Sequence, residues 1–521
     1  MIDRVLLVNP RGVSKGLGSN SLWVPVGIAD LASHLQRHSL DVKVVDLCIG
    51  QSYFGIRQLL RTLRDWQPGV IGFSGMTPTF DNTVKTARNL RTAISGEGET
   101  FGITKDIIGE NGIEGYSPIF VNGGPHTTFK TQDVLQKHVL DEMLFDYIVA
   151  GEGEYRFTKL IESLNAGETN PEIQGVYSKE RGLMDDRGKY RRVNVDDLTF
   201  PAFDLLKMRS YIQASKSRIG FKALEMVVSR GCPYICAFCS STDANVKYIP
   251  VEKVIENIKA MKAKYNIEGV WFKDSTFTTN REWTMEFCEA AEKLNREISG
   301  PALKYAASTR IDRMDDGLFT AMSDANFAHL FFGIESGSYG VLNTLRKYST
   351  TSGSGSHNEK ALEAFEKCEE HGMGATAYFM IGTPGERIDD IRQSVSLAEE
   401  LKAANSNSDI FWRVYNPLPG SELYTQLVSE ERIGGEDLNL AYHKVPQEYP
   451  YGFDAPGILS NPQLGRLVKE LILFYEKGGP KPELEKYVKM GLTSNGGADR
   501  TANASPRWNT EDKSLLYVNF K

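Results

Sequence analysis

Residues 229–240 of this 521-residue chain read SRGCPYICAFCS and hold three of its six cysteines. Cys232, Cys236 and Cys239 have the spacing C-x3-C-x2-C and follow a strand predicted over Glu225–Ser229. The other cysteines are scattered along the chain, at Cys48, Cys288 and Cys368. A secreted disulfide framework is usually shorter and denser in cysteine, so this usage favours a reducing cytoplasm. The three crowded cysteines are therefore predicted to be metal ligands.

Three thiolates in one loop suit more than one kind of centre. A cubane iron–sulfur cluster is held by cysteine thiolates, and three protein ligands would leave one iron open to a substrate or cofactor. Structural zinc prefers a closed set of four ligands, and no fourth Cys or His lies near residues 232–239. A zinc site and three unrelated core cysteines remain the alternatives. The spacing favours a [4Fe–4S] cluster.

The sequence around this loop alternates between strands and helices. Strands are predicted over Glu225–Ser229, Gly269–Lys273, Lys304–Ser308, His329–Ile334, Ala375–Ile381 and Ile410–Val414. Helices are predicted between them, over Val251–Tyr265, Trp283–Leu294, Asp315–Ser323, Glu359–Gly372 and Asp389–Leu401. Six such units predict a partial (β/α)6 barrel related to the TIM architecture over residues 222–428. A small, mostly helical C-terminal region is expected over residues 429–521, with a helix at Leu464–Tyr475.

The first 195 residues show a second βα alternation. Short apolar strands are predicted at Val5–Val8, Val42–Leu47, Val70–Phe73, Ile119–Val121 and Tyr147–Val149, and helices at Gly27–Leu35, Tyr53–Leu63 and Asn82–Ala93. This order predicts an α/β domain with a doubly wound, Rossmann-like parallel sheet. Ligands of such sheets bind beyond the carboxyl ends of the strands, where the glycines of this domain fall. Residues 95–117 are interpreted as a surface insertion and residues 196–221 as a linker.

The composition excludes some classes of protein. The chain is 41% apolar and 24% charged, which is ordinary for a globular protein, and its net charge is −7. A nucleic-acid binder would more often have a basic face, so no nucleic-acid partner is expected. No stretch approaches the ~20 apolar residues that cross a bilayer, and the first residues lack a signal-peptide pattern. A cytoplasmic protein without a membrane partner is the expectation.

The cysteine loop and the strand ends that follow it resemble the radical S-adenosylmethionine superfamily. The family motif is C-x3-C-x2-C with an aromatic residue before the last cysteine, and Phe238 fills that position. The resemblance continues at the strand ends, through Phe272–Thr278 (FKDSTFT), Ser308–Asp312 (STRID), Phe332–Gly337 (FGIESG), Phe379–Glu386 (FMIGTPGE) and Asn416–Tyr424 (NPLPGSELY). These matches cover about residues 222–425.

The resemblance implies a specific chemistry. The open iron would chelate the amino and carboxylate groups of S-adenosylmethionine, and one electron from a donor such as flavodoxin or ferredoxin would cleave the sulfonium to methionine and a 5'-deoxyadenosyl radical. The residues expected to contact this cofactor are Phe238, Ser308, Arg310, Glu335 and Ser336. Arg310 and Glu335 are the best charged candidates, and an ordinary surface or capping ion pair is the alternative for each. Glu386 is the weakest candidate, because Pro and Gly beside it can simply shape a turn.

The N-terminal domain resembles the cobalamin-binding domain that precedes the barrel in one large branch of this superfamily. The matching segments are Val5–Pro10, Trp23–Leu35, Val121–Thr127, Asp146–Glu154 and Asp197–Leu206. By this resemblance the chain binds cobalamin at its strand-end loops. The residues expected to line that site are Asn9, Ser74, Gly75, Met76, Thr77, Gly123, Gly124, Pro125, His126, Gly151, Glu152, Gly153 and Glu154.

One departure from the cobalamin pattern bears on cobalt. Some cobalamin domains use an Asp-x-His-x-x-Gly motif whose His ligates the metal, and none of the eight histidines here lies in that motif. The lower face of cobalt would then meet water or a loop residue such as Met76 or Thr77. His126 could donate to the corrin or could cap the following helix. A degenerate domain that binds no cobalamin is the alternative.

Three functions compete at this stage. The first is cobalamin-dependent methylation of an unactivated carbon in a small metabolite, natural-product intermediate or peptide. The second keeps both cofactors and performs a non-methylating oxidation, rearrangement or cyclisation. The third is a non-catalytic iron–sulfur redox protein. The aromatic residues that could face a substrate or belong to the core are Tyr378, Phe411, Trp412 and Tyr415.

Overall fold

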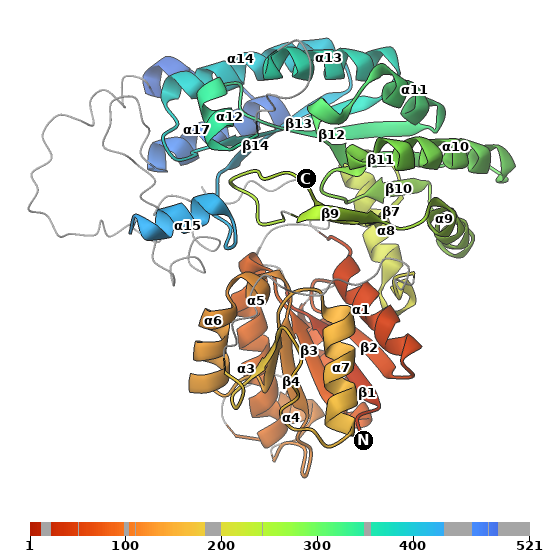
Figure 1. Ribbon diagram of the computed structural model, residues 1–521, viewed down its shortest axis with the longest axis vertical. Helices are drawn as coiled ribbons and strands as arrows, with labels where there is room; N and C mark the ends of the chain where they lie inside the picture. Colours follow the sequence, from red (N-terminus) through yellow and green to blue (C-terminus); the bar gives the residue numbers. More distant parts are fainter. Residues whose placement is uncertain are drawn as a thin grey trace, which may run out of the picture. The chain divides into compact units, whose positions relative to one another are not determined.

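The computed structural model describes residues 1–11, 22–49, 52–97, 104–109, 111–182, 200–241, 243–347, 356–431, 461–477 and 479–487. The chain divides into two compact units, and the boundary falls between residues 214 and 215 (Figure 1). Within the described ranges, no helix combines the length and apolarity that crossing a membrane requires. Each unit has its own sheet and core, and each is described by itself below.

Unit 1 is a doubly wound α/β domain. Its strands are β1 (Arg4–Asn9), β2 (Asp41–Asp46), β3 (Val70–Ser74), β4 (Ile119–Gly123), β5 (Tyr147–Val149) and β6 (Val176–Ser178), in the spatial order β2-β1-β3-β4-β5-β6. The first five run parallel and β6 is antiparallel to β5. The centre of β1 is buried on both faces, which explains its continuous apolar run.

Helices cover both faces of this sheet. They are α1 (Val26–Arg37), α2 (Ser52–Trp66), α3 (Phe80–Ser95), α4 (Thr104–Ile107), α5 (Pro125–Phe129), α6 (Thr131–Val134) and α7 (Gly153–Asn165). Helices α2 and α3 share one apolar core with the strands, while α1 packs beside α7. The predicted strands and long helices of this unit are confirmed. The antiparallel edge strand β6 was not expected.

Unit 2 is a partial barrel. Strands β7 (Ala223–Met226), β10 (Gly269–Phe272), β11 (Lys304–Thr309), β12 (Phe327–Glu335), β13 (Gly374–Ile381) and β14 (Ser408–Val414) form one open sheet, with the spatial order β14-β13-β12-β11-β10-β7. Every pair in it is parallel. The carboxyl ends of all six strands therefore lie along one edge of the sheet.

The helices of unit 2 pack on the outer face of this sheet (Figure 1). They include α9 (Val251–Tyr265), α10 (Arg281–Glu297), α11 (Asp316–Asp324), α13 (His357–Glu370), α14 (Ile388–Ala404) and α17 (Asn461–Lys477). Phe272 of β10 meets Phe287 of α10, and Trp412 of β14 meets Tyr475 of α17. Trp412 and Tyr415 are fully buried, so both are core residues. The range expected to be a linker contains helix α8 (Met208–Ile219), and residues 183–199 lie outside the described residues.

The strand predicted over Glu225–Ser229 is divided in two. Strand β7 ends at Met226, and β8 (Ser229–Cys232) pairs antiparallel with β9 (Asp243–Tyr248) in a separate sheet. The physical reason is the carboxylate of Asp274, which accepts hydrogen bonds from the backbone N–H groups of Val228 and Ser229. These two N–H groups therefore do not pair with a strand of the main sheet, and the chain turns there toward the cysteine loop.

Candidate functional site

The cysteine loop begins at the end of β8 and lies over the strand-end edge of unit 2. Cys232 and Cys236 are buried, Cys239 is half-buried, and all three thiols are free of disulfide bonds. The amide N–H of Cys239 donates to the carbonyl oxygen of Cys236 at 3.0 Å, which closes a tight turn between them. Burial raises the pKa of the Cys239 thiol. A metal would be needed to hold that sulfur as a thiolate.

Backbone hydrogen bonds hold the loop from two sides. The N–H of Ala237 donates to the carbonyl of Leu345 at 2.9 Å, and the N–H of Leu423 donates to the carbonyl of Ala237 at 2.9 Å. Leu345 follows helix α12 (Tyr339–Thr344), and Leu423 lies in α15 (Glu422–Ser429). Phe238 packs against the apolar cluster that these elements form. These contacts with α12 and α15 help to position the loop.

Asp274 supports the start of the same loop and was not named as a site residue from the sequence. Its Oδ1 accepts from the Ser229 N–H at 2.6 Å and from the Ser229 hydroxyl. The side chain is buried, and desolvation raises its pKa to about 6 although these hydrogen bonds oppose the shift. Its position directly after β10, in FKDSTFT, is the only sequence signal that could have pointed to it.

The donor set fits a cubane better than a single ion. The described residues contain no group of three or more His, Cys, Asp or Glu side chains that could hold one metal ion. A structural zinc ion prefers a closed set of four ligands, whereas this loop supplies three cysteines. A cubane places its cysteine ligands on separate irons. Three free sulfurs on one positioned loop fit that larger group.

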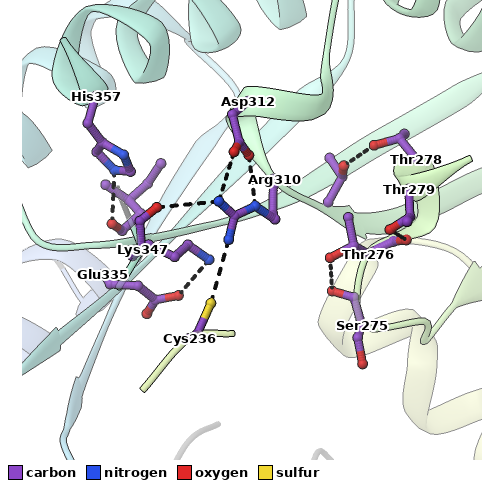
Figure 2. A network of polar contacts seen from close by, with 12 residues as sticks. Cys236, Ser275, Thr276, Thr278, Thr279, Arg310, Asp312, Glu335, Lys347 and His357 are labelled. Carbon is purple, nitrogen blue, oxygen red and sulfur yellow. Dashed lines mark hydrogen bonds and ion pairs between the residues drawn. The ribbon is translucent and has the colours of Figure 1, made fainter. Parts of the chain in front are cut away.

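Arg310 is the centre of a polar network beside Cys236, as Figure 2 shows. It follows β11, and its Nε and Nη2 bind the two carboxylate oxygens of Asp312 at 2.8 Å each. Its Nη2 also donates to the carbonyl of Lys347 at 3.3 Å, and its Nη1 to the Cys236 sulfur at 3.6 Å. The guanidinium lies 4.1 Å from the centre of the Tyr234 ring. Charge pairing with Asp312 raises the pKa of Arg310 against the desolvation that opposes it.

Glu335 and Lys347 form a second charged group in the same view (Figure 2). The Lys347 Nζ lies 3.4 Å from Glu335 Oε1, and the two side chains are 9% and 13% exposed. Glu335 has φ +66°, at a register shift between β12 and β13. A Cβ at Gly333 would lie 2.5 Å from Glu335 Oε1, so the glycine makes room for the carboxylate. A non-glycine residue held in this strained conformation is typical of a functional site.

Lys347 was missed because nothing in its sequence position distinguishes it from a surface lysine. Only the fold buries it, by returning the chain after α12 to the strand ends.

The two serines expected to contact the cofactor lie at the ends of β11 and β12. Ser308 is half-buried at the end of β11. Ser336 is fully buried, and its hydroxyl lies 3.0 Å from the Ser394 hydroxyl of α14. The structure therefore gives Ser336 a contact that links β12 to α14.

The strand ends of unit 1 form the second candidate region. The strand order β2-β1-β3 places the topological switch point between β1 and β3, where doubly wound sheets bind ligands. Asn9 ends β1 and Ser74 ends β3, so both flank that point. The Asn9 amide nitrogen donates to Asp46 Oδ1 at 2.9 Å. Met76, two residues after β3, is 56% exposed.

The loops after β3 and β4 are in direct contact. The Gly75 N–H donates to the carbonyl of Gly123, and the His126 N–H to the carbonyl of Gly75, both at 3.2 Å. Gly124 has φ +94° and ψ −179°, and an added Cβ would lie 2.9 Å from both the Gly75 oxygen and the Ser74 Oγ. Only glycine fits such a position. The two loops therefore form one closely packed backbone surface, followed by Pro125 at the start of α5.

His126 turns its ring into the fold. It is 6% exposed, stacks on Phe80 at 4.0 Å, and its Nδ1 lies 3.2 Å from the Thr77 hydroxyl. Burial lowers its pKa to about 4, so the ring is neutral at pH 7.

The remaining strand-end residues of unit 1 follow β5. Gly151 has φ +83°, and its N–H donates to the hydroxyl of Thr128 at 2.9 Å. Glu152 and Gly153 begin α7, while Glu154 is buried. The structure thus brings the loops after β3, β4 and β5 together, as expected from the sequence.

Comparison with known proteins identifies unit 2. The profile of the radical S-adenosylmethionine superfamily matches residues 226–398, from the end of β7 into α14. Residues 226–398 are therefore a radical S-adenosylmethionine domain. A radical S-adenosylmethionine domain uses a [4Fe–4S] cluster and S-adenosylmethionine, and the cysteine loop lies inside the matched range.

Relatives in sequence extend over most of the chain. An uncharacterized methyltransferase of Pyrococcus horikoshii is 26% identical over 439 residues, which are 83% of this chain and 84% of the relative. The cytidylyl-2-hydroxyethylphosphonate methyltransferase of Streptomyces wedmorensis is 22% identical over 84% of this chain and 83% of the relative. An anaerobic magnesium-protoporphyrin IX monomethyl ester cyclase of Rubrivivax gelatinosus is 24% identical over 81% of this chain and 70% of the relative.

Solved structures match both units of the fold. The radical S-adenosylmethionine methyltransferase TsrM of Kitasatospora setae, solved with tryptophan and an S-adenosylmethionine analogue, has a TM-score of 0.62 and 17% identity. This match covers 82% of this chain and 76% of TsrM. OxsB, a cobalamin-dependent radical enzyme solved with aqua-cobalamin and S-adenosylmethionine, has a TM-score of 0.58 and 19% identity, over 93% of this chain and 64% of OxsB. At these identities the likeness establishes the fold.

The radical S-adenosylmethionine domain also contains an unusual buried acid, Glu386. Its Oε2 accepts from the Gly382 N–H at 2.5 Å and the Thr383 N–H at 3.0 Å, while Oε1 has no hydrogen-bond partner among the described residues. Burial raises its pKa to about 8. Glu386 therefore holds the turn after β13 together from inside, which agrees with the turn-shaping alternative.

We expect Glu386 to give the protein a measurable pH dependence. A carboxyl whose pKa is higher in the folded state binds its proton more tightly there, so stability falls as pH rises from about 4.5 to about 8. Lys273 and the buried histidines also titrate in part between pH 6.5 and 8, but their contribution is the same in the wild type and in Glu386→Gln, so it cancels in the comparison. The urea midpoint should fall over this window in the wild type and less in Glu386→Gln. Equal slopes would contradict the assignment.

Proposed function

We propose that this chain is a cobalamin-dependent radical S-adenosylmethionine methyltransferase that methylates an unactivated carbon of a small molecule or peptide. The observation that carries the proposal is the extent of the fold match, which covers both units and includes a protein that holds cobalamin and S-adenosylmethionine together. The methyltransferase relatives span more than four-fifths of the chain, so they support the same reading.

Within unit 2, we assign Cys232, Cys236 and Cys239 as the ligands of the [4Fe–4S] cluster. When bound, the cluster supplies the electron that cleaves S-adenosylmethionine. The protein's part is to hold the three sulfurs on a loop that is fixed by Asp274 and by the Ala237 backbone. Three ligands leave one iron for the cofactor, as an open coordination position requires.

Glu335 and Lys347 suit the polar groups of S-adenosylmethionine. The cofactor carries an amino group, a carboxylate and ribose hydroxyls, and this buried ion pair offers one acceptor and one donor of opposite charge at the strand-end edge. The amino group of the bound cofactor could pair with Glu335 and its carboxylate with Lys347, so neither buried charge would be left unpaired. Arg310 has its donors directed at protein groups, so it is the less suitable cation for this role.

Replacing Glu335 with glutamine should weaken S-adenosylmethionine binding by roughly tenfold to a hundredfold, since a hydrogen bond to a charged group contributes about 1.5–3 kcal/mol. Iron content should not change. Glu422→Gln is the matched control, because Glu422 also forms an ion pair, with Arg346, but that pair is exposed. Equilibrium dialysis gives the dissociation constants. An unchanged constant in Glu335→Gln, or a loss of iron, would show that Glu335 is structural.

Unit 1 offers a site for cobalamin at the strand ends. The packed loops after β3 and β4 present backbone groups beside the switch point, and the exposed Met76 adds an apolar surface that a corrin face could cover. Bound cobalamin would supply the methyl group. The assigned residues are Asn9, Ser74, Gly75, Met76, Thr77, Gly123, Gly124, Pro125, His126, Gly151, Glu152, Gly153 and Glu154.

The ratio of two co-products tests methyl transfer. A methyltransferase of this kind consumes one S-adenosylmethionine to make the radical and a second to remethylate cobalt, so 5'-deoxyadenosine and S-adenosylhomocysteine should form in equal amounts with substrate. Liquid chromatography of quenched reactions measures both. Deoxyadenosine without S-adenosylhomocysteine would exclude methylation.

Formation of 5'-deoxyadenosine without S-adenosylhomocysteine would favour a different reaction with the same cofactors. The cyclase of Rubrivivax gelatinosus is as similar to this chain as the methyltransferases are, at 24% identity over 434 residues. An oxidative cyclisation or rearrangement would then be the function. In either case we propose an electron donor of the flavodoxin or ferredoxin class and a cytoplasmic location, where the six free thiols stay reduced.

A further inference from the structure

Arg310 is directed at the cluster loop. A guanidinium has five N–H groups, and Arg310 donates two hydrogen bonds to Asp312, one to the Lys347 carbonyl and one to the Cys236 sulfur. The side chain is 8% exposed. The Nε–Nη2 edge of the guanidinium, which usually binds a carboxylate in two places, is already occupied by Asp312. Arg310 therefore cannot offer that edge to the carboxylate of a ligand. The geometry thus gives Arg310 a partner that the sequence did not suggest.

Asp312 and Tyr234 fix the orientation of this contact. The aspartate takes the Nε–Nη2 edge of the guanidinium, which leaves Nη1 to face the sulfur (Figure 2). Tyr234 lies under the guanidinium plane, two residues before Cys236 in the same loop. The positive charge is therefore presented to Cys236 by a rigid set of contacts rather than by a mobile side chain.

We propose that Arg310 is a positioning residue that raises the reduction potential of the cluster through its N–H···S hydrogen bond to Cys236. The inference rests on the proposed assignment of the cysteines as cluster ligands. Reduction adds one electron from an external donor and changes [4Fe–4S]²⁺ to [4Fe–4S]⁺, so the negative charge on the cluster and its sulfurs increases. A donor and a cation beside one sulfur stabilise that reduced form more than the oxidised form.

Arg313, which directly follows the Ser308–Asp312 motif, provides a matched control. It lies over the same Tyr234 ring at 5.2 Å, but it is exposed, and no hydrogen bond found among the described residues joins it to a cysteine. Arg310→Gln and Arg313→Gln remove the same charge at neighbouring positions. Only the first removes a contact with the sulfur.

The test is the one-electron midpoint potential of the reconstituted full-length protein, followed by electron paramagnetic resonance. Arg310→Gln should shift the ratio of reduced to oxidised cluster at fixed potential at least tenfold toward the oxidised form, which is 59 mV for one electron. Arg310→Lys, which keeps the charge and loses the planar fork, should shift it less. Arg313→Gln should shift it by under a third as much as Arg310→Gln. Equal shifts in Arg310→Gln and Arg313→Gln would overturn the inference.

A second measurement decides the case in which Arg310→Gln does not retain its cluster. Wild-type protein labelled with ¹⁵N-arginine should show a ¹⁵N hyperfine coupling in pulsed electron paramagnetic resonance of the reduced cluster, and Arg313→Gln should keep it. Absence of this coupling in a wild-type cluster would overturn the role of Arg310. A wild type that binds no iron would instead overturn the cluster assignment itself, so the two failures are distinguishable.

Discussion

Cys236→Ala is expected to abolish the reductive cleavage of S-adenosylmethionine. Wild-type protein reconstituted without oxygen should hold about four irons per chain, the content of one cubane. The variant removes one of the three ligands, so one iron loses its protein ligand and the cluster is no longer held in the loop. No 5'-deoxyadenosine should be detected by liquid chromatography after reduction with dithionite. Because the electron enters through the cluster, Cys232→Ala and Cys239→Ala should have the same effect.

Cys368→Ala is the control for this experiment. Cys368 lies in α13, is fully buried, and is packed in the core of unit 2, where burial raises its pKa beyond the ordinary range of a thiol. Its removal should leave iron content and cleavage unchanged relative to the wild type. Retained cleavage in Cys236→Ala, or lost iron in Cys368→Ala, would contradict the ligand assignment.

Unit 1 is expected to bind one cobalamin per chain with no histidine nitrogen on cobalt. The Asp-x-His-x-x-Gly motif is absent, and His126, the histidine in the strand-end loops, is buried against Phe80 and the Thr77 hydroxyl. An imidazole below cobalt would strengthen the axial field and hinder reduction to cobalt(I), which must attack the second S-adenosylmethionine. A weak lower ligand therefore suits a methyltransferase. Without cobalamin, methyl transfer should be lost while cleavage of S-adenosylmethionine persists.

The sequence predicts the sheets well because both are parallel and buried. Val5–Val8 and the later apolar runs have to be covered on both faces, so their pattern is continuous and bounded by turns. Helix α9 begins and ends at the predicted residues, Val251 and Tyr265. The short edge strand β6 and the division between β7 and β8 were not predicted, since each depends on a tertiary partner. For β8 that partner is the carboxylate of Asp274.

The candidate site was predictable only in part, for a related reason. The three cysteines could be named because their spacing is local. The roles of Arg310 and Lys347 depend on which side chains the fold brings to the strand ends. Arg310 was expected to bind the cofactor, and the sequence did not indicate its contacts with Asp312 and Cys236. Lys347 becomes visible as a candidate only when its ion pair with the strained Glu335 is seen.

One measurement tests the central claim most directly: the electron paramagnetic resonance spectrum of a single protein sample reconstituted with iron, sulfide and cobalamin. We predict a cobalt(II) signal without nitrogen superhyperfine splitting and, after further reduction, the signal of a [4Fe–4S]⁺ cluster that changes when S-adenosylmethionine is added. Nitrogen splitting would contradict the histidine-free cobalt site. A sample with an intact cluster and no bound corrin would contradict the account as a whole, because unit 1 would then bind no cobalamin.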